Sequence, residues 1–326
     1  MNVGLVIPVH NRRELTLACL RRLRADGVLG WAEAIVVDDG STDGTADAVR
    51  AEFPEAVLLR GDGRLWWTGA TALGMSEALT RGARHIFWLN DDCAPAPGAC
   101  RRLLDTATRT GTVVTGVCRV EPAGLVVYGG LRRGRIGLQL VTDLGDDLTA
   151  CDAACGNFVC FPRAVVEALS LPDARRFPHA HGDTDYTLRA TAQGFRVCID
   201  PQARAEARPN ALRNHASWLH GDISLAEMWS GLWQVRSYSY FPTHFRYLAR
   251  HFGWRGAAFC LWTVAKRVPI TAVRLLVPRA WRQRWWGHTS AVWQEEKRLH
   301  AALAEPPAAT TPYSGNQPPT QPGHAK

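Results

Sequence analysis

Residues 3–92 alternate between short apolar runs and segments with helical spacing, and this alternation constrains the fold more than any other feature of the sequence. Short continuous apolar runs are typical of strands that are buried on both faces of a sheet. Parallel strands need crossover connections, which the intervening helical segments would provide. The sequence therefore predicts an α/β fold in which helices flank a mostly parallel sheet. The apolar runs are VGLVIPV, AEAIVVDD, EAVLLR and HIFWLNDD.

The alternation becomes looser in the second half of the chain, where two helices are expected in PRAVVEALSL and DTDYTLRATAQG and a last strand in FRVCID. After about residue 215 the pattern changes to amphipathic helices rich in Trp and Arg. From Ala304 onward the chain is polar and Pro-rich, which is typical of disorder. We therefore expect an α/β domain in residues 1–215, a basic, Trp-rich helical extension in 216–303 and a disordered tail in 304–326. Further strands are expected near 113–118, 124–128 and 157–161.

Three of the expected strands end in polar residues. Because ligands bind beyond the carboxyl ends of the strands of an open parallel sheet, we expect these residues to lie together. The adjacent carboxylates of Asp91 and Asp92 repel each other, so either water or a metal ion would accompany them. Oxygen ligands favour Mg²⁺ or Mn²⁺, which would bind the diphosphate of a substrate. The strands end in Pro8–Asn11, Asp38–Ser41 and Asn90–Asp92.

Two further segments near these strand ends are candidates for substrate contacts. The Asp38–Asp39 pair suits hydrogen bonds from the base or ribose of a nucleotide, and it also suits a role in capping the turn that follows. Trp66 and Trp67 precede a helix that Thr68 or Gly69 would begin. Because aromatic faces stack on the C–H surfaces of sugars, one of these rings is expected to contact substrate and the other to pack in the core. Arg64 is a candidate partner for a phosphate. Asn11 is expected to cap the first helix, with Glu14 three residues later.

The net charge of +8 is concentrated after about residue 200, where Arg and Lys are interleaved with Trp and Phe. This composition favours an anionic partner such as a membrane surface or a nucleic acid, and it is also compatible with a solvated helical face. The best apolar stretch, 256–278, is interrupted by charges and Pro269, so we expect it to lie on a membrane rather than to cross it. Nine scattered cysteines without a C-x-x-C pair argue against zinc. No signal-type segment opens the chain, so a cytoplasmic protein is expected.

Six motifs resemble those of the family 2 glycosyltransferases and occur in that family's order. The resemblance extends over about residues 1–205 and is closest to the bacterial branch with rhamnosyltransferases and galactofuranosyltransferases of cell-surface polysaccharides. It implies an inverting enzyme of the GT-A fold that uses a UDP- or dTDP-sugar donor and a glycan or lipid-linked acceptor, with no nucleic acid partner. The motifs are VIPVHNR, VVDDGSTDGT, WWTGATALG, FWLNDDC, GNFVCFPR and HGDTDYTLRATAQGF.

The resemblance also implies roles for individual residues. Asn90, Asp91 and Asp92 take the place of the family's D-x-D motif, in which Asp92 would bind Mg²⁺ or Mn²⁺ and Asp91 the ribose or a metal-bound water. Asp183 stands where the family has its catalytic base, with Asp185 as its partner, although Gly182 replaces the acidic residue that usually precedes the base. Asp39 would contact the nucleotide base. The nucleotide pocket would be lined by Pro8, His10, Asn11, Asp39, Gly69 and Asp91.

The chemistry gives an independent reason for a second acidic residue far along the chain. In inverting transfer the acceptor hydroxyl attacks from the face opposite the leaving diphosphate, so a carboxylate must lie within reach of its proton while the metal stabilises the diphosphate. Asp92 and Asp183 suit these roles if they face one pocket, and the alternative role of Asp183 is to cap its helix. Many relatives supply a His as a further metal ligand after the FRVCID strand. None occurs there in this chain, so Glu206 or water would take its place.

Two other functions remain open. A nucleotidyltransferase has a similar architecture, although its loop after the first strand is normally rich in Gly. A non-catalytic scaffold would bind membrane or nucleic acid through the basic C-terminal half. A dinucleotide-dependent oxidoreductase is disfavoured, because PVHNRREL contains no Gly where G-x-G-x-x-G is expected. A lipid-linked acceptor would place the enzyme peripherally at the inner face of the plasma membrane, held there by the basic helices.

Overall fold

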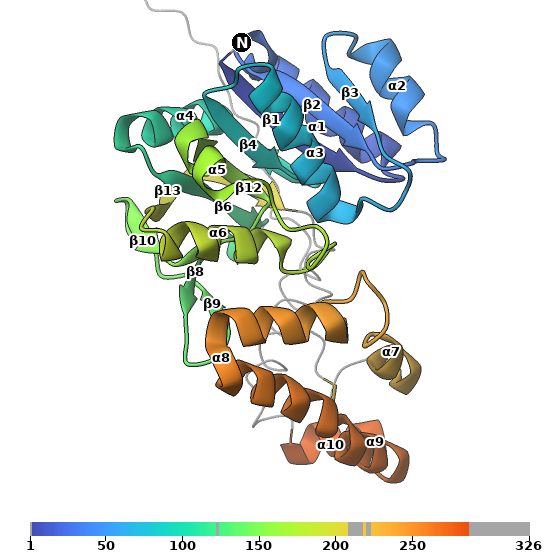
Figure 1. Cartoon of the computed structure of the whole chain (residues 1–326). Coiled ribbons are helices and arrows are strands. Elements are labelled where there is room, and N and C mark those ends of the chain that lie inside the picture. Colours follow the sequence, from blue (N-terminus) through green and yellow to red (C-terminus); the bar gives the residue numbers. More distant parts are fainter. Residues whose placement is uncertain (1, 122–123, 208–217, 220–222, 287–326) are drawn as a thin grey trace, which may run out of the picture.

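The computed structural model describes residues 2–121, 124–207, 218–219 and 223–286, which form an α/β domain followed by a helical arm (Figure 1). The main sheet has the strand order β10-β13-β6-β12-β4-β1-β2-β3. Strands β1 to β4 pair in parallel, as the apolar runs predict, so the expected fold class is confirmed. These strands are β1 (Val3–Val9), β2 (Glu33–Asp38), β3 (Val57–Arg60) and β4 (His85–Leu89).

Helices cover both faces of the main sheet and give the domain three layers. On one face α1, α2 and α4 pack into a core that contains Leu20 and Leu103. On the other face α3, α5 and α6 pack into a second core that contains Met75 and Tyr186. Successive residues of β1 alternate between the two cores, as expected for a central strand. The helices are α1 (Arg13–Ala25), α2 (Thr45–Glu52), α3 (Trp66–Thr80), α4 (Ala99–Thr110), α5 (Arg163–Leu169) and α6 (Gly182–Ala192).

The second half of the sheet differs in detail from the sequence-based expectation. β12 (Phe158–Pro162) runs antiparallel between β4 and β6 (Val113–Val120), so its first residue lies beside the last residue of β4. β13 (Val197–Ala207) continues well past the predicted FRVCID strand because it pairs first with β6 and then with β5. The structure also contains a separate three-stranded sheet, with the order β11-β8-β9, which the sequence did not predict. The remaining elements are η1 (Val28–Gly30), β5 (Cys93–Pro95), β7 (Leu125–Tyr128), β8 (Gly130–Arg133), β9 (Leu138–Leu140), β10 (Thr149–Cys151) and β11 (Ala153–Ala154).

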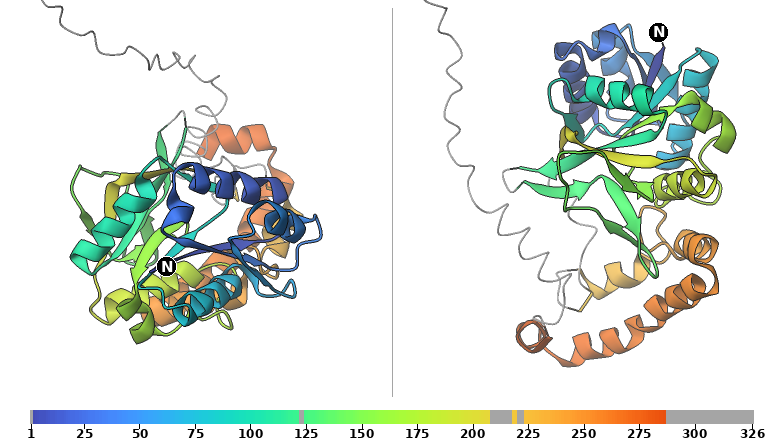
Figure 2. Two further views of the ribbon diagram at one scale, coloured as in Figure 1. Left: turned by 90° about the horizontal axis from the view of Figure 1, so that it is seen from above. Right: turned by 90° about the vertical axis from the view of Figure 1, so that its left-hand side faces the viewer.

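The C-terminal helices form an arm that extends away from the main sheet (Figures 1 and 2). α8 bends at Gly253, whose φ of 62° interrupts the helix, and its first half packs against the domain through Tyr247 and Leu248. No helix within the described ranges is both long enough and apolar enough to span a bilayer. The expected tail 304–326 lies outside the described residues, as do parts of the expected extension. The helices are α7 (Leu225–Ser230), α8 (Phe241–Ala265), α9 (Arg267–Leu276) and α10 (Arg279–Trp286).

Candidate functional site

The polar ends of β1, β2 and β4 lie at one edge of the sheet, because these three strands are adjacent and parallel. Val9 is in register with Asp38, and the residues that follow both strands contact each other: His10 Nδ1 donates to the Asp39 carbonyl at 2.6 Å. Antiparallel β12 brings Asn157 to the same edge, where its carbonyl accepts from Asn90 N at 3.0 Å. We call this edge the polar rim. It comprises His10, Asn11, Asp38, Asp39, Asn90, Asp91 and Asp92.

Arg12 provides the cation that accompanies the two adjacent carboxylates. Its Nη1 lies 2.9 Å from Asp91 Oδ1 and 2.8 Å from Asp92 Oδ2. Thr16 donates to the other oxygen of Asp91 at 3.1 Å, so both Asp91 oxygens are engaged. Burial raises the pKa of Asp91 while Arg12 opposes that shift, and the two carboxylates in turn raise the pKa of Arg12 despite its own partial burial. Arg12 is therefore a partner of the Asp91–Asp92 pair that the sequence, which suggested water or a metal ion, did not indicate.

Asp92 is the rim residue that best fits a divalent metal. Its carboxylate is 31% exposed, and only Oδ2 is engaged by Arg12. Mg²⁺ typically keeps several waters and binds one or two carboxylates together with substrate phosphates, so a single accessible carboxylate is compatible with it. Among the described residues, no cluster of three or more His, Cys, Asp or Glu side chains could hold a metal. Glu206 lies opposite Ala94 in the β13–β5 pair, two residues from Asp92.

The other predicted nucleotide residues hold the turns after β1 and β2. Asp39 accepts three backbone N–H groups, from Gly63 at 2.9 Å, Leu65 at 3.2 Å and Trp66 at 2.8 Å. Asp38 accepts from Ser41 N with Oδ1, whereas its buried Oδ2 has no partner among the described residues. Both carboxylates therefore fix the rim, and only Asp38 keeps a wholly unengaged oxygen.

Pro8 and Asn11 lie on the β1 side of the rim. Pro8 is in register with Val37 of β2. Asn11 has a positive φ of 51°, and its side chain accepts from Thr42 N at 2.8 Å, so it bridges two turns and does not cap α1 as expected. Nucleotide binding by these residues stays a prediction.

The two consecutive tryptophans differ in their surroundings. Trp67 packs edge-on against Trp88, with ring centroids 5.5 Å apart, and its Nε1 donates to Asn90 Oδ1 at 2.8 Å. Trp66 has a positive φ of 55° and carries Arg236 over its ring, at 5.5 Å from the centroid. Trp67 thus packs against the core, as expected for one of the two rings, and contact of Trp66 with substrate stays a prediction.

Two neighbours of the tryptophans were also predicted to contact substrate. Gly69 is buried inside α3, where an added Cβ would lie 3.3 Å from Leu65 Cβ, so its observed role is close packing. Arg64 is exposed, and its backbone N donates to Asp62 at 2.9 Å. Contacts of either residue with substrate stay predictions.

Asp183 lies at the first turn of α6 and is connected to the polar rim by two consecutive residues. Gly156 N donates to Asp183 Oδ2 at 2.8 Å, and the next residue, Asn157, binds Asn90. A second connection passes through Trp67, because a Cβ on Gly156 would lie 2.5 Å from the Trp67 ring and 3.0 Å from Asp183 Cβ. The structure therefore brings Asp183 to the rim.

The surroundings of Asp183 are suited to proton transfer. Burial raises the pKa of Asp183, while the N–H groups of Gly156 and Thr184 lower it in part. A buried carboxyl with a raised pKa is a typical candidate for general acid–base chemistry. The preceding position is Gly182 because any Cβ there would lie 2.1 Å from the Thr68 hydroxyl.

Asp185 faces the arm rather than the rim. Its fully buried carboxylate accepts from His251 at 2.8 Å and from Arg189 at 3.1 Å, and Arg250 lies 3.2 Å away. These contacts tie α6 to α8. Asp185 therefore holds the helix that carries Asp183 and does not contact Asp183 directly.

The arm supplies further residues that the sequence analysis did not identify. His181 has a positive φ of 67°, stacks on Tyr247 at a centroid distance of 4.2 Å and bonds His244 at 3.0 Å. Burial lowers the pKa of His181, and it lowers that of His244 to about 4. Arg236 reaches Trp66 from the segment before α8. The basic, aromatic composition of the arm was the available signal, but it did not indicate which residues reach the rim.

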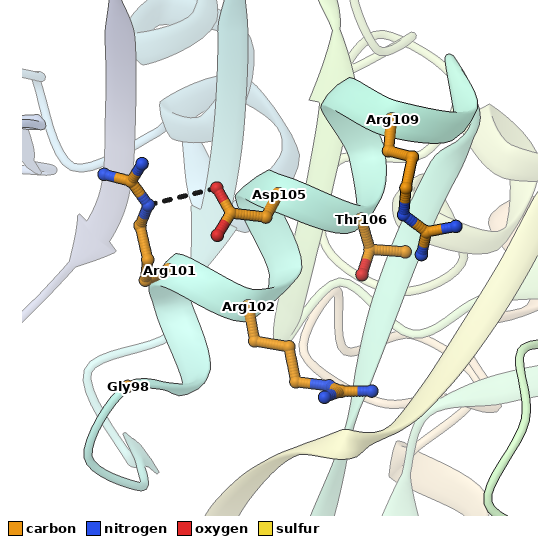
Figure 3. Close-up of a pocket in the computed structure, with 6 residues that line it drawn as sticks. All are labelled: Gly98, Arg101, Arg102, Asp105, Thr106 and Arg109. Carbon is orange, nitrogen blue, oxygen red and sulfur yellow. Dashed lines mark hydrogen bonds and ion pairs between the residues drawn. The ribbon is translucent and has the colours of Figure 1, made fainter.

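A pocket on α4 is separate from the rim, because no rim residue lines it (Figure 3). Two of its three arginines are engaged in structural pairs: Arg101 with Asp105 at 3.0 Å and Arg102 with Asp200 at 2.9 Å. The pocket therefore adds nothing to the candidate site.

Removing the Arg12 guanidinium is expected to destabilise the protein. In Arg12→Gln, Asp91 would remain buried with only Thr16 as a charge-stabilising partner. The expected loss in the free energy of unfolding is about 1–3 kcal/mol, a range that already discounts for the 44% exposure of Arg12. Urea unfolding measures this loss. Arg12→Gln combined with Asp91→Asn should be less destabilised than the sum of the two single variants, and strict additivity would contradict the pairing.

The chain is similar in sequence to a known family and to several known proteins. A family model described as Glycosyl transferase family 2 matches residues 5–165. Galactofuranosyltransferase GlfT1 of Mycobacterium tuberculosis is 30% identical over 211 residues, which are 61% of this chain and 68% of that protein. The GlfT1 of Mycolicibacterium smegmatis is 27% identical and is covered to 60% of its length. Undecaprenyl-phosphate mannosyltransferase of Micrococcus luteus is 35% identical over 130 residues, which are 39% of this chain and 52% of that protein.

Two solved structures share the fold. A mannosyltransferase from Pyrobaculum calidifontis, PcManGT in complex with GDP-Man and Mn²⁺, aligns with a TM-score of 0.53 over 93% of this chain and 86% of its own, at 15% identity. GalNAc-T7 with UDP, GalNAc and Mn²⁺ aligns with a TM-score of 0.54 over 64% of this chain and 44% of its own, at 13% identity. At these identities the likeness concerns the fold alone.

Proposed function

The chain belongs to glycosyl transferase family 2, and on this premise we propose that it transfers a sugar from a nucleoside-diphosphate sugar to a hydroxyl group of a glycan or lipid-linked acceptor, with inversion at the anomeric carbon. The observation that carries the proposal is the connection of Asp183 to Asn90 through Gly156 and Asn157. This connection links a desolvated carboxylate to the rim that carries Asp91 and Asp92, which supports a base and a metal-binding carboxylate at one site, as such a reaction needs.

Asp183 is the general base of the proposed reaction. The acceptor oxygen forms a bond to the anomeric carbon, and its proton passes to Asp183. The bond between the anomeric carbon and the diphosphate oxygen breaks, and its electron pair stays on the diphosphate. The N–H groups of Gly156 and Thr184 fix the carboxylate in one orientation, which reduces the cost of positioning it against the acceptor. A pKa raised toward the working pH makes it a stronger base than an exposed aspartate.

Asp92 would hold Mg²⁺ or Mn²⁺, and the bound metal would stabilise the charge that develops on the leaving diphosphate. Arg12 supports this role because it neutralises one of the two charges of the Asp91–Asp92 pair, which leaves the site with one net negative charge for a cation. Both solved neighbours contain Mn²⁺, which supports a divalent metal.

The residues at the ends of β1 and β2 would bind the nucleotide. Pro8, His10, Asn11 and Asp39 border the rim on this side, and the unengaged oxygen of Asp38 is an acceptor for a base or ribose donor. A UDP- or dTDP-sugar is the proposed donor. One relative is named a galactofuranosyltransferase and another an undecaprenyl-phosphate mannosyltransferase. These names support a glycan or lipid-linked acceptor.

A thermal-shift comparison of UDP, dTDP, GDP and ADP, each with and without Mn²⁺, tests the proposal on the full chain. UDP or dTDP is expected to stabilise the protein most, and more with Mn²⁺ than without. A ligand at about 100 times its Kd stabilises by about 2.7 kcal/mol, which shifts the midpoint of thermal unfolding measurably. Asp105→Asn, on the surface of α4, is the matched control and should respond like the wild type. If none of the four diphosphates raised the midpoint, the non-catalytic scaffold would become the better explanation.

A further inference from the structure

The helices in residues 254–286 present apolar side chains to solvent in a regular stripe. After the bend at Gly253, α8 exposes Trp254, Leu261 and Trp262, and α9 exposes Leu275 and Leu276 at 71% and 81%. Leu261 and Trp262 follow Trp254 by seven and eight positions, and Leu275 and Leu276 follow Val268 by the same numbers, so each set lies on one side of its helix. We call this surface the outward apolar face. It comprises Trp254, Phe259, Leu261, Trp262, Val268, Leu275, Leu276, Trp281 and Trp285.

The inner sides of the same helices carry arginines. Arg267 is fully buried and donates to the Met228 carbonyl at 2.8 Å. Arg274 donates to the Trp218 carbonyl at 2.9 Å, and Arg282 donates to the carbonyls of Leu219 and Val277. Burial lowers the pKa of all three guanidinium groups.

The apolar and charged residues of these helices are placed in the opposite way from those of an amphipathic helix on the surface of a soluble protein. A water-facing helix points its apolar stripe into the core and its charged residues outward. Here three arginines are turned inward and partly desolvated, while large Trp and Leu side chains stay exposed. Apolar patches of this kind mark sites of interaction with another molecule or a membrane. Something other than water is therefore expected to cover the outward apolar face.

The charge of the arm indicates which kind of molecule covers the outward apolar face. Residues 228–286 contain ten Lys or Arg and neither Asp nor Glu. Arg255, Arg279 and Arg284 are exposed on the same helices as the apolar side chains. A second copy of the arm would bring the same positive charge to the contact and be repelled, whereas anionic lipid headgroups would be attracted.

We propose that the outward apolar face inserts into the surface of an anionic phospholipid bilayer. The helices lie in the plane of the interface, with the Trp and Leu side chains at the boundary of headgroups and acyl chains and the exposed arginines on the lipid phosphates. The three inward arginines hold the helices together on the side away from the acyl chains. This binding does not depend on sugar transfer, so it is tested separately from the proposed function.

Vesicle co-sedimentation of the full chain tests the proposal. The wild type is expected to bind vesicles of phosphatidylcholine with phosphatidylglycerol, to bind vesicles of phosphatidylcholine alone more weakly, and to lose most of this difference in high salt. The double variants Leu275→Ser/Leu276→Ser and Trp254→Ser/Trp262→Ser should each lower the partition coefficient by about tenfold or more. Leu73→Ser removes an exposed apolar side chain on α3, distant from this face in sequence, and should leave the coefficient unchanged.

Two results would overturn the proposal. One is a wild type that does not bind the phosphatidylglycerol vesicles, or double variants that bind them as tightly as the wild type while unfolding at the same temperature. The other is an oligomeric wild type that both double variants convert to monomers in analytical ultracentrifugation with no change in vesicle binding. That result would assign the face to contact between copies.

Discussion

Asp183→Asn is expected to lower kcat for sugar transfer by about 10²–10⁴-fold, the usual contribution of a positioned general base. An amide cannot take the proton of the acceptor hydroxyl, whereas the nucleotide and metal residues across the rim would be unaffected. Binding of the donor should therefore change little. The rate would be measured with the donor nucleotide that gives the largest thermal shift.

The pH dependence of the wild type provides a second measure of the same group. Burial raises the pKa of Asp183, so the base becomes protonated and activity falls as pH drops through a value above that of an ordinary aspartate. The acid limb of kcat/KM should disappear in Asp183→Asn. Asp105→Asn is the control for a carboxylate lost elsewhere. If Asp183→Asn kept a rate within a few fold of the wild type, or kept the acid limb of kcat/KM, Asp183 would not be the general base.

Asp92→Asn is expected to lower the transfer rate by about 10²–10³-fold, the range found when one group that stabilises transition-state charge is removed. The neutral side chain would keep a contact with Arg12 but lose most of its affinity for a divalent cation. Stabilisation by the nucleotide alone should persist, while the additional stabilisation by Mn²⁺ should vanish.

Removal of the metal from the wild type distinguishes the loss of metal binding in Asp92→Asn from a structural disturbance of the polar rim. A chelator should reduce the wild-type rate to about that of Asp92→Asn and leave the variant's rate unchanged. A wild type that is indifferent to the chelator would contradict metal assistance. Arg12 and Arg236 would then be the cations left to stabilise the diphosphate.

The sequence predicted the first half of the fold well because buried parallel strands leave a continuous apolar signal. The run VGLVIPV coincides with β1, and HIFWLNDD contains β4 and the rim residues that follow it. The three-stranded sheet in 130–154 was missed because its strands are short and carry no such run. The antiparallel direction of β12 also has no local signature, since it depends on which strands become neighbours.

The candidate site was predictable only in its acidic members. Adjacent aspartates after a strand are visible in the sequence, whereas their partners are distant: Arg12 precedes Asp91 by 79 positions. Gly156 gave no signal because its importance comes from the space it leaves between Trp67 and Asp183. Asp185 looked like part of a catalytic pair, and its contacts with Arg250 and His251 depend on an arm whose docking no motif specifies.

That docking joins the arm and the helix that carries Asp183 into a single structural unit. Asp185 shares its carboxylate with residues 189, 250 and 251, and His181 is enclosed by aromatic residues of the arm. A chimaera that kept this α/β domain but borrowed another C-terminal extension would keep the buried Asp185 carboxylate with Arg189 but without its partners Arg250 and His251. Diversification among related chains is thus expected to change both parts in concert, and modular exchange near residue 215 should be rare.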